Sequence, residues 1–287
     1  MYRADRVRQE VHGETMPMLH PQQLLHVYEL KGGVPPPFLN LEGLVGIWPE
    51  ADYTYLFFTV AADAVVETFV REHPEFHLTH QYKLRYDQWQ DLAAREPLTV
   101  DRFRIITRDR PVHLFSGEIL LRIDPGVIFG SGLHPTTRGC LRALSRLYTE
   151  TRPARVLDLG TGSGILAIAA AKLGARKVVA LDMNPIAIST AAANCRRNGV
   201  ADRISLKQAD AREQLSDAEL LCVNIHFDFL RVLLETFQLC RYRWAILSGF
   251  LKDRLPALLG LLPPCARLEQ PALEERCWIT LIVKMED

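Results

Sequence analysis

The sequence predicts an α/β fold with a mostly parallel sheet, preceded by a small α+β domain. Residues 155–182 read as a short apolar strand, a turn with three glycines, an alanine-rich helix and a second apolar strand that ends on an acid. Strands and helices alternate after this unit, and the last two predicted strands follow each other directly. Residues 24–84, in contrast, hold three predicted strands and one helix.

The glycine turn indicates the class of ligand. Its three glycines alternate along the chain: Gly160, Gly162 and Gly164. A dinucleotide site has the spacing G-x-G-x-x-G and would need glycine where Ile165 stands. Asp158, just before the turn, is unfavourable for a phosphate and favours a cationic ligand such as S-adenosylmethionine. Asp182, 22 residues after Gly160, is placed to accept hydrogen bonds from both ribose hydroxyls. The alternative is an ordinary βαβ unit with a tight turn.

The composition excludes several classes of protein. The 287 residues carry 34 basic and 34 acidic side chains, so the net charge does not indicate a nucleic-acid or membrane partner. The first residues lack the apolar core of a signal peptide, and the longest apolar stretch, residues 255–266, is interrupted by Pro263 and Pro264. We therefore expect a soluble, cytoplasmic protein.

The cysteines are not spaced like a metal site or a redox motif. None of the six belongs to a C-x-x-C pair, and four lie inside apolar runs, where a reduced, buried thiol is expected: the six are Cys140, Cys195, Cys222, Cys240, Cys265 and Cys277. No set of residues suggests a metal centre or a nucleophilic triad.

The first part of the chain predicts a recognition or packing module without chemistry of its own. Residues 1–20 are expected to form a loose arm, and residues 21–92 a small α+β domain. Its predicted strands span residues 24–30, 53–60 and 76–84, its helix spans residues 63–72, and a proline loop covers residues 34–37. Between residues 86 and 110 the apolar pattern becomes sparse, which places the start of the second domain, residues 93–287, in this region.

A second informative stretch, residues 124–137, follows a predicted strand at 118–123. Its glycines suggest a backbone that passes close to a ligand, and His134 to Thr137 predict the start of a helix that runs to about Tyr148. The alternative is a simple turn and N-cap in which His134 is structural.

The remaining elements bring polar side chains to the same edge of the sheet. Asp210 lies just past a predicted strand at 204–207, and Asn224 ends the strand 220–224. We expect Asp210 to face the adenine amino group. Further predicted helices span residues 185–197, 227–239 and 251–262, and further strands span residues 244–247, 267–269 and 277–283.

These motifs resemble those of the bacterial methyltransferases that modify large-subunit ribosomal protein eleven. Phe129 to Thr137 is similar to the family signature F-G-T-G-x-H-P-T-T, with serine for the first threonine, and the glycine turn, Asp182 and Asn224-Ile225 follow in family order. The resemblance covers about residue 86 to the end. It implies a class I, Rossmann-like, seven-stranded methyltransferase sheet. The cofactor-binding residues that it implies are Thr137, Gly160, Asp182 and Asn224.

Two stretches depart from the family. The family usually continues its asparagine as N-I-L-A, whereas His226-Phe227-Asp228 follow here, which predicts a narrower entrance for the substrate. The family's N-terminal domain is a ferredoxin-like module that binds the ribosomal protein, and here the proline loop at 34–37 takes the place of its first helix.

The expected chemistry is methyl transfer from S-adenosylmethionine to an amine, on a lysine side chain or at an N-terminus, by in-line displacement. Asn224 is the candidate catalytic residue, because its carbonyl could orient the amine. His226 is a candidate for proton removal, although a role in packing is the favoured alternative. The first hypothesis is a methyltransferase for ribosomal protein eleven, and the second is a related enzyme with another protein or small-molecule substrate. The third is a cofactor-binding partner protein without catalysis.

Overall fold

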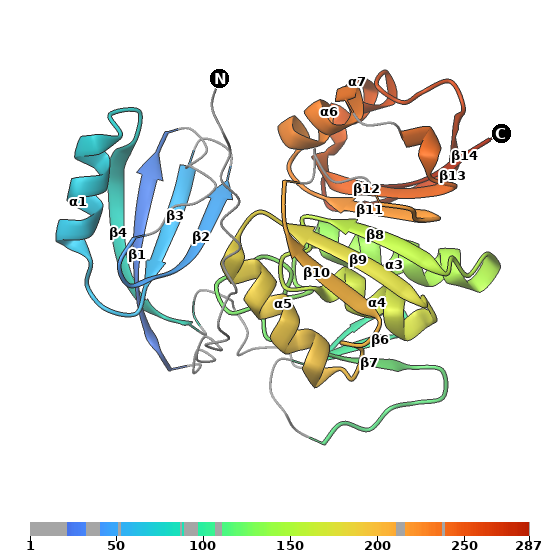
Figure 1. Ribbon diagram of the computed structural model, residues 1–287, viewed down its shortest axis with the longest axis horizontal. Helices are drawn as coiled ribbons and strands as arrows, with labels where there is room; N and C mark the ends of the chain where they lie inside the picture. The colour runs from blue at the N-terminus through green and yellow to red at the C-terminus, as the bar shows by residue number, and fades with distance from the viewer. Residues whose placement is uncertain are drawn as a thin grey trace, which may run out of the picture.

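A computed structural model describes residues 22–32, 41–50, 53–86, 88, 97–106, 111–210, 216–236 and 239–286. The expected arm at 1–20, the proline loop at 34–37 and the boundary between residues 92 and 93 lie outside these residues. The described chain forms an N-terminal domain with one helix, labelled α1, and a larger α/β domain (Figure 1).

The N-terminal domain is a four-stranded sheet with the order β2-β3-β1-β4 and antiparallel neighbours. Its elements are β1 (Leu24–Lys31), β2 (Leu44–Glu50), β3 (Tyr53–Phe58), α1 (Asp63–Glu72) and β4 (His77–Arg85). The β3-α1-β4 crossover passes over β1, so the expected β-α-β second half is present. Strand β2 was missing from the sequence prediction, because Gly46 and Pro49 weaken its pattern.

The two faces of this sheet have different neighbours. Tyr28 and Leu30 of β1 pack with Val66 and Phe69 of α1, which lies on the side away from the larger domain (Figure 1). Alternate residues of β1 point to the other face, because side chains alternate along a strand. That second face therefore remains available for contact with the larger domain.

The larger domain contains a seven-stranded sheet with the order β10-β9-β8-β11-β12-β14-β13. Its strands are β8 (Arg155–Leu159), β9 (Lys177–Asp182), β10 (Ile204–Gln208), β11 (Leu220–Asn224), β12 (Trp244–Leu251), β13 (Ala266–Glu275) and β14 (Trp278–Met285). All pairs up to β12 are parallel, and β14 runs antiparallel to both β12 and β13. The predicted fold class is confirmed.

Helices cover both faces of this sheet (Figure 1). They are α3 (Pro135–Glu150), α4 (Ile165–Leu173), α5 (Pro185–Arg197), α6 (Phe227–Thr236) and α7 (Leu255–Leu259), with short 3₁₀ turns η1 (Leu239–Arg241) and η2 (Lys252–Arg254). Successive residues of β8 show the division. Val156 belongs to the core under α3 and α4, whereas Leu157 belongs to the core under α6 and α7. The sheet is therefore buried on both sides, as its continuous apolar strands predict.

A small third sheet, with the order β5-β6-β7, packs into the core under α3 and α4 through Val100, Phe103 and Leu121. Its strands are β5 (Leu98–Val100), β6 (Phe103–Ile106) and β7 (Ile119–Arg122). Only β7 was predicted, because β5 and β6 are too short to give a clear pattern.

The region after β12 also differs from the prediction. Residues 251–262 were expected to be one helix, but β12 extends to Leu251, which pairs with Trp278, and α7 is only five residues long. Pro256 interrupts the helical hydrogen bonds, so the segment divides into η2 and α7. The predicted strand at 267–269 is part of the ten-residue strand β13.

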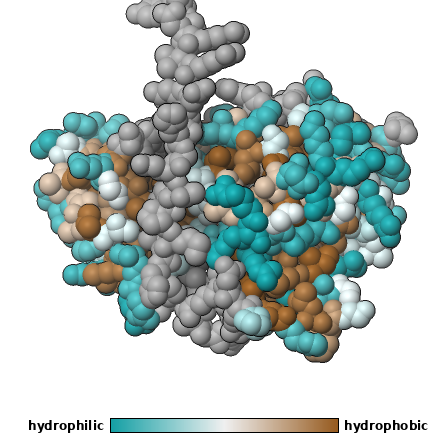
Figure 2. Space-filling model, turned by 60° about the horizontal axis from the view of Figure 1, so that its bottom comes forward, coloured by the Kyte–Doolittle hydropathy of each residue, from teal (hydrophilic) through white to brown (hydrophobic). Residues whose placement is uncertain are grey.

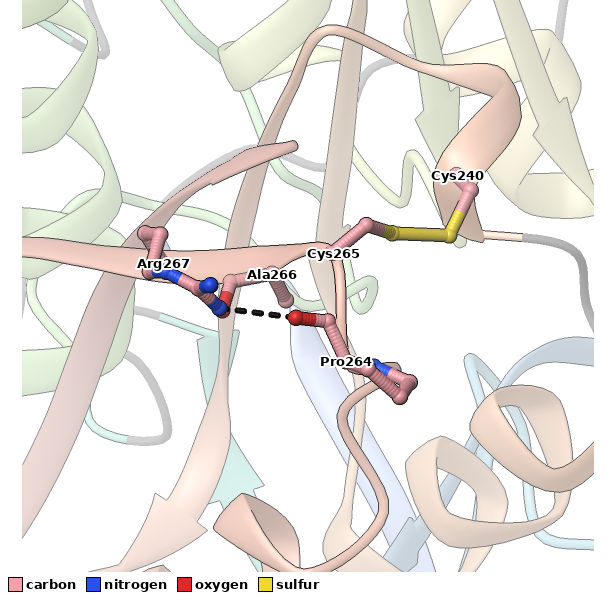
Figure 3. The surroundings of a disulfide bond; sticks show 5 residues. All are labelled: Cys240, Pro264, Cys265, Ala266 and Arg267. Atoms are coloured by element: carbon pink, nitrogen blue, oxygen red, sulfur yellow. Dashed lines mark hydrogen bonds between the residues drawn. A yellow bond between two sulfur atoms is a disulfide. The ribbon is translucent and has the colours of Figure 1, made fainter. Parts of the chain in front are cut away.

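Two cysteines form a disulfide that the sequence analysis did not anticipate. Cys240 in η1 and Cys265, just before β13, are bonded, with Cα atoms 6.8 Å apart and a sequence separation of 25 (Figure 3). Arg267 Nη1 donates to the Pro264 carbonyl at 2.7 Å in the same turn. Cys140, Cys195 and Cys222 are free and buried, as expected.

Figure 2 shows the hydropathy of one face of the molecule. On the face in Figure 2, hydrophilic and hydrophobic side chains are interspersed over both domains. Within the described ranges, no helix is both long and apolar enough to cross a membrane. The same residues contain no group of three or more His, Cys, Asp or Glu side chains arranged to hold a metal ion.

Candidate active site

The site lies where the strand order of the large sheet reverses. From β8 the chain continues to β9 and β10 on one side, and then crosses to β11 and β12 on the other. In open α/β sheets, ligands bind at the carboxyl ends of the strands at such a switch point. Gly160 follows β8 and Asn224 ends the adjacent strand β11, so the two predicted residues flank this point.

The glycine turn after β8 has a conformation that requires glycine. Gly160, Gly162 and Gly164 have φ values of +66°, +55° and +85°. A Cβ atom on Gly162 would lie 2.6 Å from the carbonyl oxygen of Phe129. The turn therefore packs directly against the stretch 124–137, and of its three glycines only Gly160 is partly accessible.

Asp182 connects the second strand to this turn. Its Oδ2 accepts a hydrogen bond from the Gly162 N–H at 2.9 Å, and its Oδ1 accepts one from the Asn184 N–H, also at 2.9 Å. Burial raises the pKa of Asp182, and these backbone donors oppose that rise. Because each carboxylate oxygen can accept more than one hydrogen bond, Asp182 can hold the turn and still bind a ligand hydroxyl.

Asp158 lies beneath the turn, in the core. It is 1% exposed, and its Oδ2 accepts a hydrogen bond from the Thr161 hydroxyl at 2.6 Å. Burial raises the pKa of Asp158 to about 7. The observed role of Asp158 is to hold the turn, and its contact with a cofactor stays a prediction.

Asp210 lies near Asp182 at the end of the neighbouring strand. The N–H of Ala209, one residue before Asp210, donates to the Asp182 carbonyl at 3.0 Å. The half-buried Asp210 is thus on the β10 side of the edge, and its contact with adenine stays a prediction.

The start of α3 presents a buried hydroxyl without a partner. His134 is the N-cap of α3, and its Nδ1 lies 2.8 Å from the Thr136 hydroxyl. The hydroxyl of Thr137, one residue further on, is completely buried and has no hydrogen-bond partner among the described residues. A buried hydroxyl is rarely left unpaired in a native protein, so Thr137 is suited to a ligand.

Asn224 shows the same feature at the end of β11. Its Oδ1 is buried and, within the part of the chain that the structure describes, makes no hydrogen bond. The next residue, Ile225, extends its side chain to 2.8 Å from where a Cβ of Gly160 would be. Gly249 allows this arrangement, because a Cβ there would lie 1.9 Å from the Ile225 carbonyl oxygen.

Sequence reasoning missed the residues that join the stretch 124–137 to the glycine turn. Asn194, in the middle of α5, is completely buried. Its Nδ2 donates to the carbonyl oxygens of Asp124 and Ser163, at 2.9 Å in each case. Ser163 in turn donates from its N–H to Phe129 O at 3.0 Å and from its hydroxyl to Gly130 O at 2.7 Å. The available signal was the placement of a poor helix former within an alanine-rich helix.

The C-terminal hairpin supports the same stretch from the other side. Glu275 in β13 accepts hydrogen bonds from Arg138 and Arg142 of α3. The His134 ring packs against Phe129 and Trp278, with ring centroids 5.2 and 4.8 Å away. Burial lowers the pKa of His134, so this histidine is a neutral N-cap, as the structural alternative predicted.

A model of the family described as "Ribosomal protein L11 methyltransferase (PrmA)" matches residues 59–286 of the chain. That range includes the whole site and well over half of the sequence. The chain belongs to the ribosomal protein L11 methyltransferase family. The resemblance predicted from the signature and the glycine turn is therefore confirmed.

Individual relatives agree with this family. The ribosomal protein L11 methyltransferase of Thermus thermophilus is 34% identical over 241 residues, which cover 80% of this chain and 88% of the relative. That of Citrifermentans bemidjiense is 39% identical over 144 residues, which cover 48% of this chain and 47% of the relative. Some matches thus span only about half the length of the curated relatives.

Among solved structures, a ribosomal protein L11 methylase from Lactobacillus delbrueckii subsp. bulgaricus is 27% identical, with a TM-score of 0.57. The match covers 65% of this chain and 96% of that one. This similarity supports the fold of the larger domain.

The stretch that departs from the usual family sequence forms the first turn of α6. The N–H of Leu230 donates to the His226 carbonyl oxygen at 3.1 Å, so His226 precedes the helix and Phe227 begins it. The His226 side chain is exposed, and desolvation of its ring lowers the pKa of His226, which Asp228 partly offsets. The imidazole is therefore neutral near pH 7. The narrower entrance expected from this stretch remains a prediction.

Proposed function

We propose that the protein transfers a methyl group from S-adenosylmethionine to amino groups of ribosomal protein L11, on lysine side chains, at the N-terminus or both. The observation that carries this proposal is the pair of buried, unpartnered oxygens on Thr137 and Asn224 beside the glycine turn. The site lacks two hydrogen-bond partners, which a bound amino acid moiety and a substrate amine can supply.

The residues at the edge fit this cofactor. Asp182 would accept from the ribose hydroxyls, and the turn at Gly160 and Gly162 would border the methionine portion. Thr137, at the start of α3, would bind the same methionine portion, and Asp210 would face the adenine. S-adenosylmethionine supplies an electrophilic methyl group on a sulfonium when it is bound.

The protein's contribution to the reaction is orientation and removal of water. A lysine amine reacts only in its neutral form, with its lone pair aligned with the methyl group. The Asn224 carbonyl oxygen can accept an N–H of that amine, which turns the lone pair toward the methyl. The Ile225 side chain over Gly160 excludes water beside it. His226 is neutral and exposed just before α6. It could either remove a proton from the substrate amine or pack against the substrate.

The substrate is proposed from the relatives, which are named for ribosomal protein L11, and from the position of the N-terminal domain. This domain contacts the stretch 124–137 through Val127 and so lies beside the site, where it could hold a protein. We retain the cytoplasmic location expected from the sequence, because the substrate is a ribosomal component. No direct contact with nucleic acid or a membrane is part of the proposal.

Purified L11 and methyl-labelled cofactor test this proposal directly. The wild-type protein should place label on L11. The Asn224→Ala variant should reduce turnover more than cofactor affinity if Asn224 orients the amine, and affinity more than turnover if it binds only the methionine portion. Label absent from L11 but present on another component of a cell extract would move the assignment to a different substrate. Failure to bind the cofactor would overturn the proposal altogether.

A further inference from the structure

Val127, in the stretch 124–137, lies where this stretch packs against the N-terminal domain. Val127 lies two residues before Phe129 and is 2% exposed. It belongs to the apolar cluster on the second face of the N-terminal sheet, together with Leu25, Val27 and Phe57. A residue of the stretch 124–137 is thus part of the core of the N-terminal domain.

A glycine in β2 makes room for this contact. A Cβ atom on Gly46 would lie 1.9 Å from Val127 Cγ2 and 2.7 Å from Val127 Cβ. Valine is branched at Cβ and has a restricted χ1, so it cannot turn away without moving its backbone. Any larger residue at position 46 must therefore displace the loop at Val127.

The stretch 124–137 contacts the glycine turn immediately after Val127. The carbonyl oxygens of Phe129 and Gly130 accept the two hydrogen bonds from Ser163 at 3.0 and 2.7 Å. Consecutive Cα atoms are about 3.8 Å apart, so Val127 and Phe129 can be separated by no more than about 7 to 8 Å. Over such a distance, a shift at Val127 reaches the Ser163 contacts with little chain to absorb it.

We infer that Val127 is a positioning residue that couples the N-terminal sheet to the cofactor site through the fit between Val127 and Gly46. When the sheet holds Val127, Phe129 and Gly130 are held against the glycine turn. When it does not, the turn loses part of its support. This inference rests on the proposed cofactor site. By linkage, the cofactor must stabilise the contact between Val127 and the sheet by the same factor as that contact strengthens cofactor binding.

A size exchange between the two residues tests the inference. S-adenosylmethionine binding is measured by calorimetry for wild type, Gly46→Ala, Val127→Ala and the double variant. Gly46→Ala should weaken binding by about fivefold or more, the lower end of typical coupling between sites. The double variant removes both Cγ atoms of Val127 and so the 1.9 Å contact, but the two Cβ atoms would still be 2.7 Å apart, so it should recover part of that loss.

Leu30→Ala serves as the matched control. Leu30 is completely buried in the same sheet, but it packs on the opposite face under α1. This variant should lower the melting temperature of the protein and leave cofactor affinity within about twofold, since a typical core truncation acts on stability. The control separates coupling from general damage to the N-terminal domain.

A second readout does not depend on whether Gly46→Ala folds. In the wild-type protein, S-adenosylmethionine should slow amide exchange in β2 and β3, and in Val127→Ala this protection should be lost. Equal cofactor affinity in wild type, both single variants and the double variant would overturn the inference, as would loss of affinity in Leu30→Ala. If the wild-type protein itself did not bind the cofactor, the proposed function would fail instead.

Discussion

Two sides of the same sheet edge differ in how their polar groups are satisfied. On the side of β8 and β9, both oxygens of Asp182 accept hydrogen bonds, from the N–H groups of Gly162 and Asn184. On the side of β11 and α3, oxygens of Asn224 and Thr137 are buried without partners in the described ranges. The polar groups on the first side are satisfied within the folded protein, whereas those on the second side are left for a ligand to satisfy. Substitutions on the two sides should therefore separate stability from affinity.

Asp182→Ala should have the largest effect, because it removes hydrogen bonds of both kinds. Loss of two charge-assisted hydrogen bonds to the ribose, on the order of 1.5–3 kcal/mol each, should weaken S-adenosylmethionine binding by well over tenfold in calorimetry. The variant should also unfold at lower urea concentration without cofactor, since Gly162 and Asn184 lose their acceptor. Unchanged affinity would reject the ribose assignment, and unchanged stability would reject the structural half of the comparison. Asp182→Asn is the milder control.

Asp158→Asn, on the side of β8 and β9, should change how the free energy of unfolding depends on pH. The pKa of Asp158 is raised to about 7 in the folded protein, above its unfolded value near 3.9. The folded state therefore binds the proton more tightly, and this stabilising contribution, complete below about pH 4, is lost as the pH rises through 7.

The variant cannot titrate at this position, so its free energy of unfolding minus that of wild type should increase between pH 5 and pH 8. The expected change is on the order of a few kcal/mol, measured by urea unfolding at both pH values. Asp202→Asn, at an exposed aspartate, should show no such trend. A flat difference for Asp158→Asn would mean that its carboxylate is ionised at both pH values.

Loss of the disulfide should lower the stability of the protein without changing the cofactor site at the sheet edge. The bond closes a loop of 25 residues, for which the entropic model gives about 3 kcal/mol. Cys240→Ser should thus reduce the melting temperature and leave cofactor affinity unchanged. Cys277→Ser, at an exposed free cysteine, provides the control. An affinity change in Cys240→Ser would show that stability and binding are not separable in this domain.

Substitutions of the adjacent Thr136 and Thr137 should have the smallest effects, but these effects should be opposite in sign. Thr137→Val replaces an unpartnered buried hydroxyl with an apolar group of the same shape, and should raise the free energy of unfolding by about 1 kcal/mol. Cofactor affinity should fall by about fivefold, equivalent to one neutral hydrogen bond.

Thr136→Val should lower stability instead, because the Thr136 hydroxyl pairs with His134, and should have a smaller effect on cofactor binding. Both variants are followed by thermal unfolding with and without S-adenosylmethionine. If the two variants changed stability in the same direction, the distinction between partnered and unpartnered hydroxyls would not hold.

The parts that sequence could predict are those set by local pattern. Residues 155–182 form the expected strand, glycine turn, helix and strand, because apolar runs and glycines determine them locally. Strand β11 begins and ends where predicted, at Leu220 and Asn224. The family followed from the signature and the glycine turn.

The parts that sequence could not predict depend on distant partners. Asn194 is an ordinary helical residue until α5 packs against Asp124 and Ser163. Cys240 and Cys265 belong to different apolar segments, and only the turns at their ends bring them together. The contact of Val127 with Gly46 joins two domains, so neither local pattern could show it.

The hairpin of β13 and β14 is made last during synthesis on the ribosome, although β14 pairs with β12 inside the sheet. Strand β14 lies between β12 and β13 in the sheet, and Glu275 before it holds the arginines of α3. A nascent chain that has emerged only as far as β12 has every residue of the cofactor edge but lacks these supports. The supports from β14 and Glu275 can therefore form only after Met285 has left the exit tunnel, although the N-terminal sheet can fold much earlier.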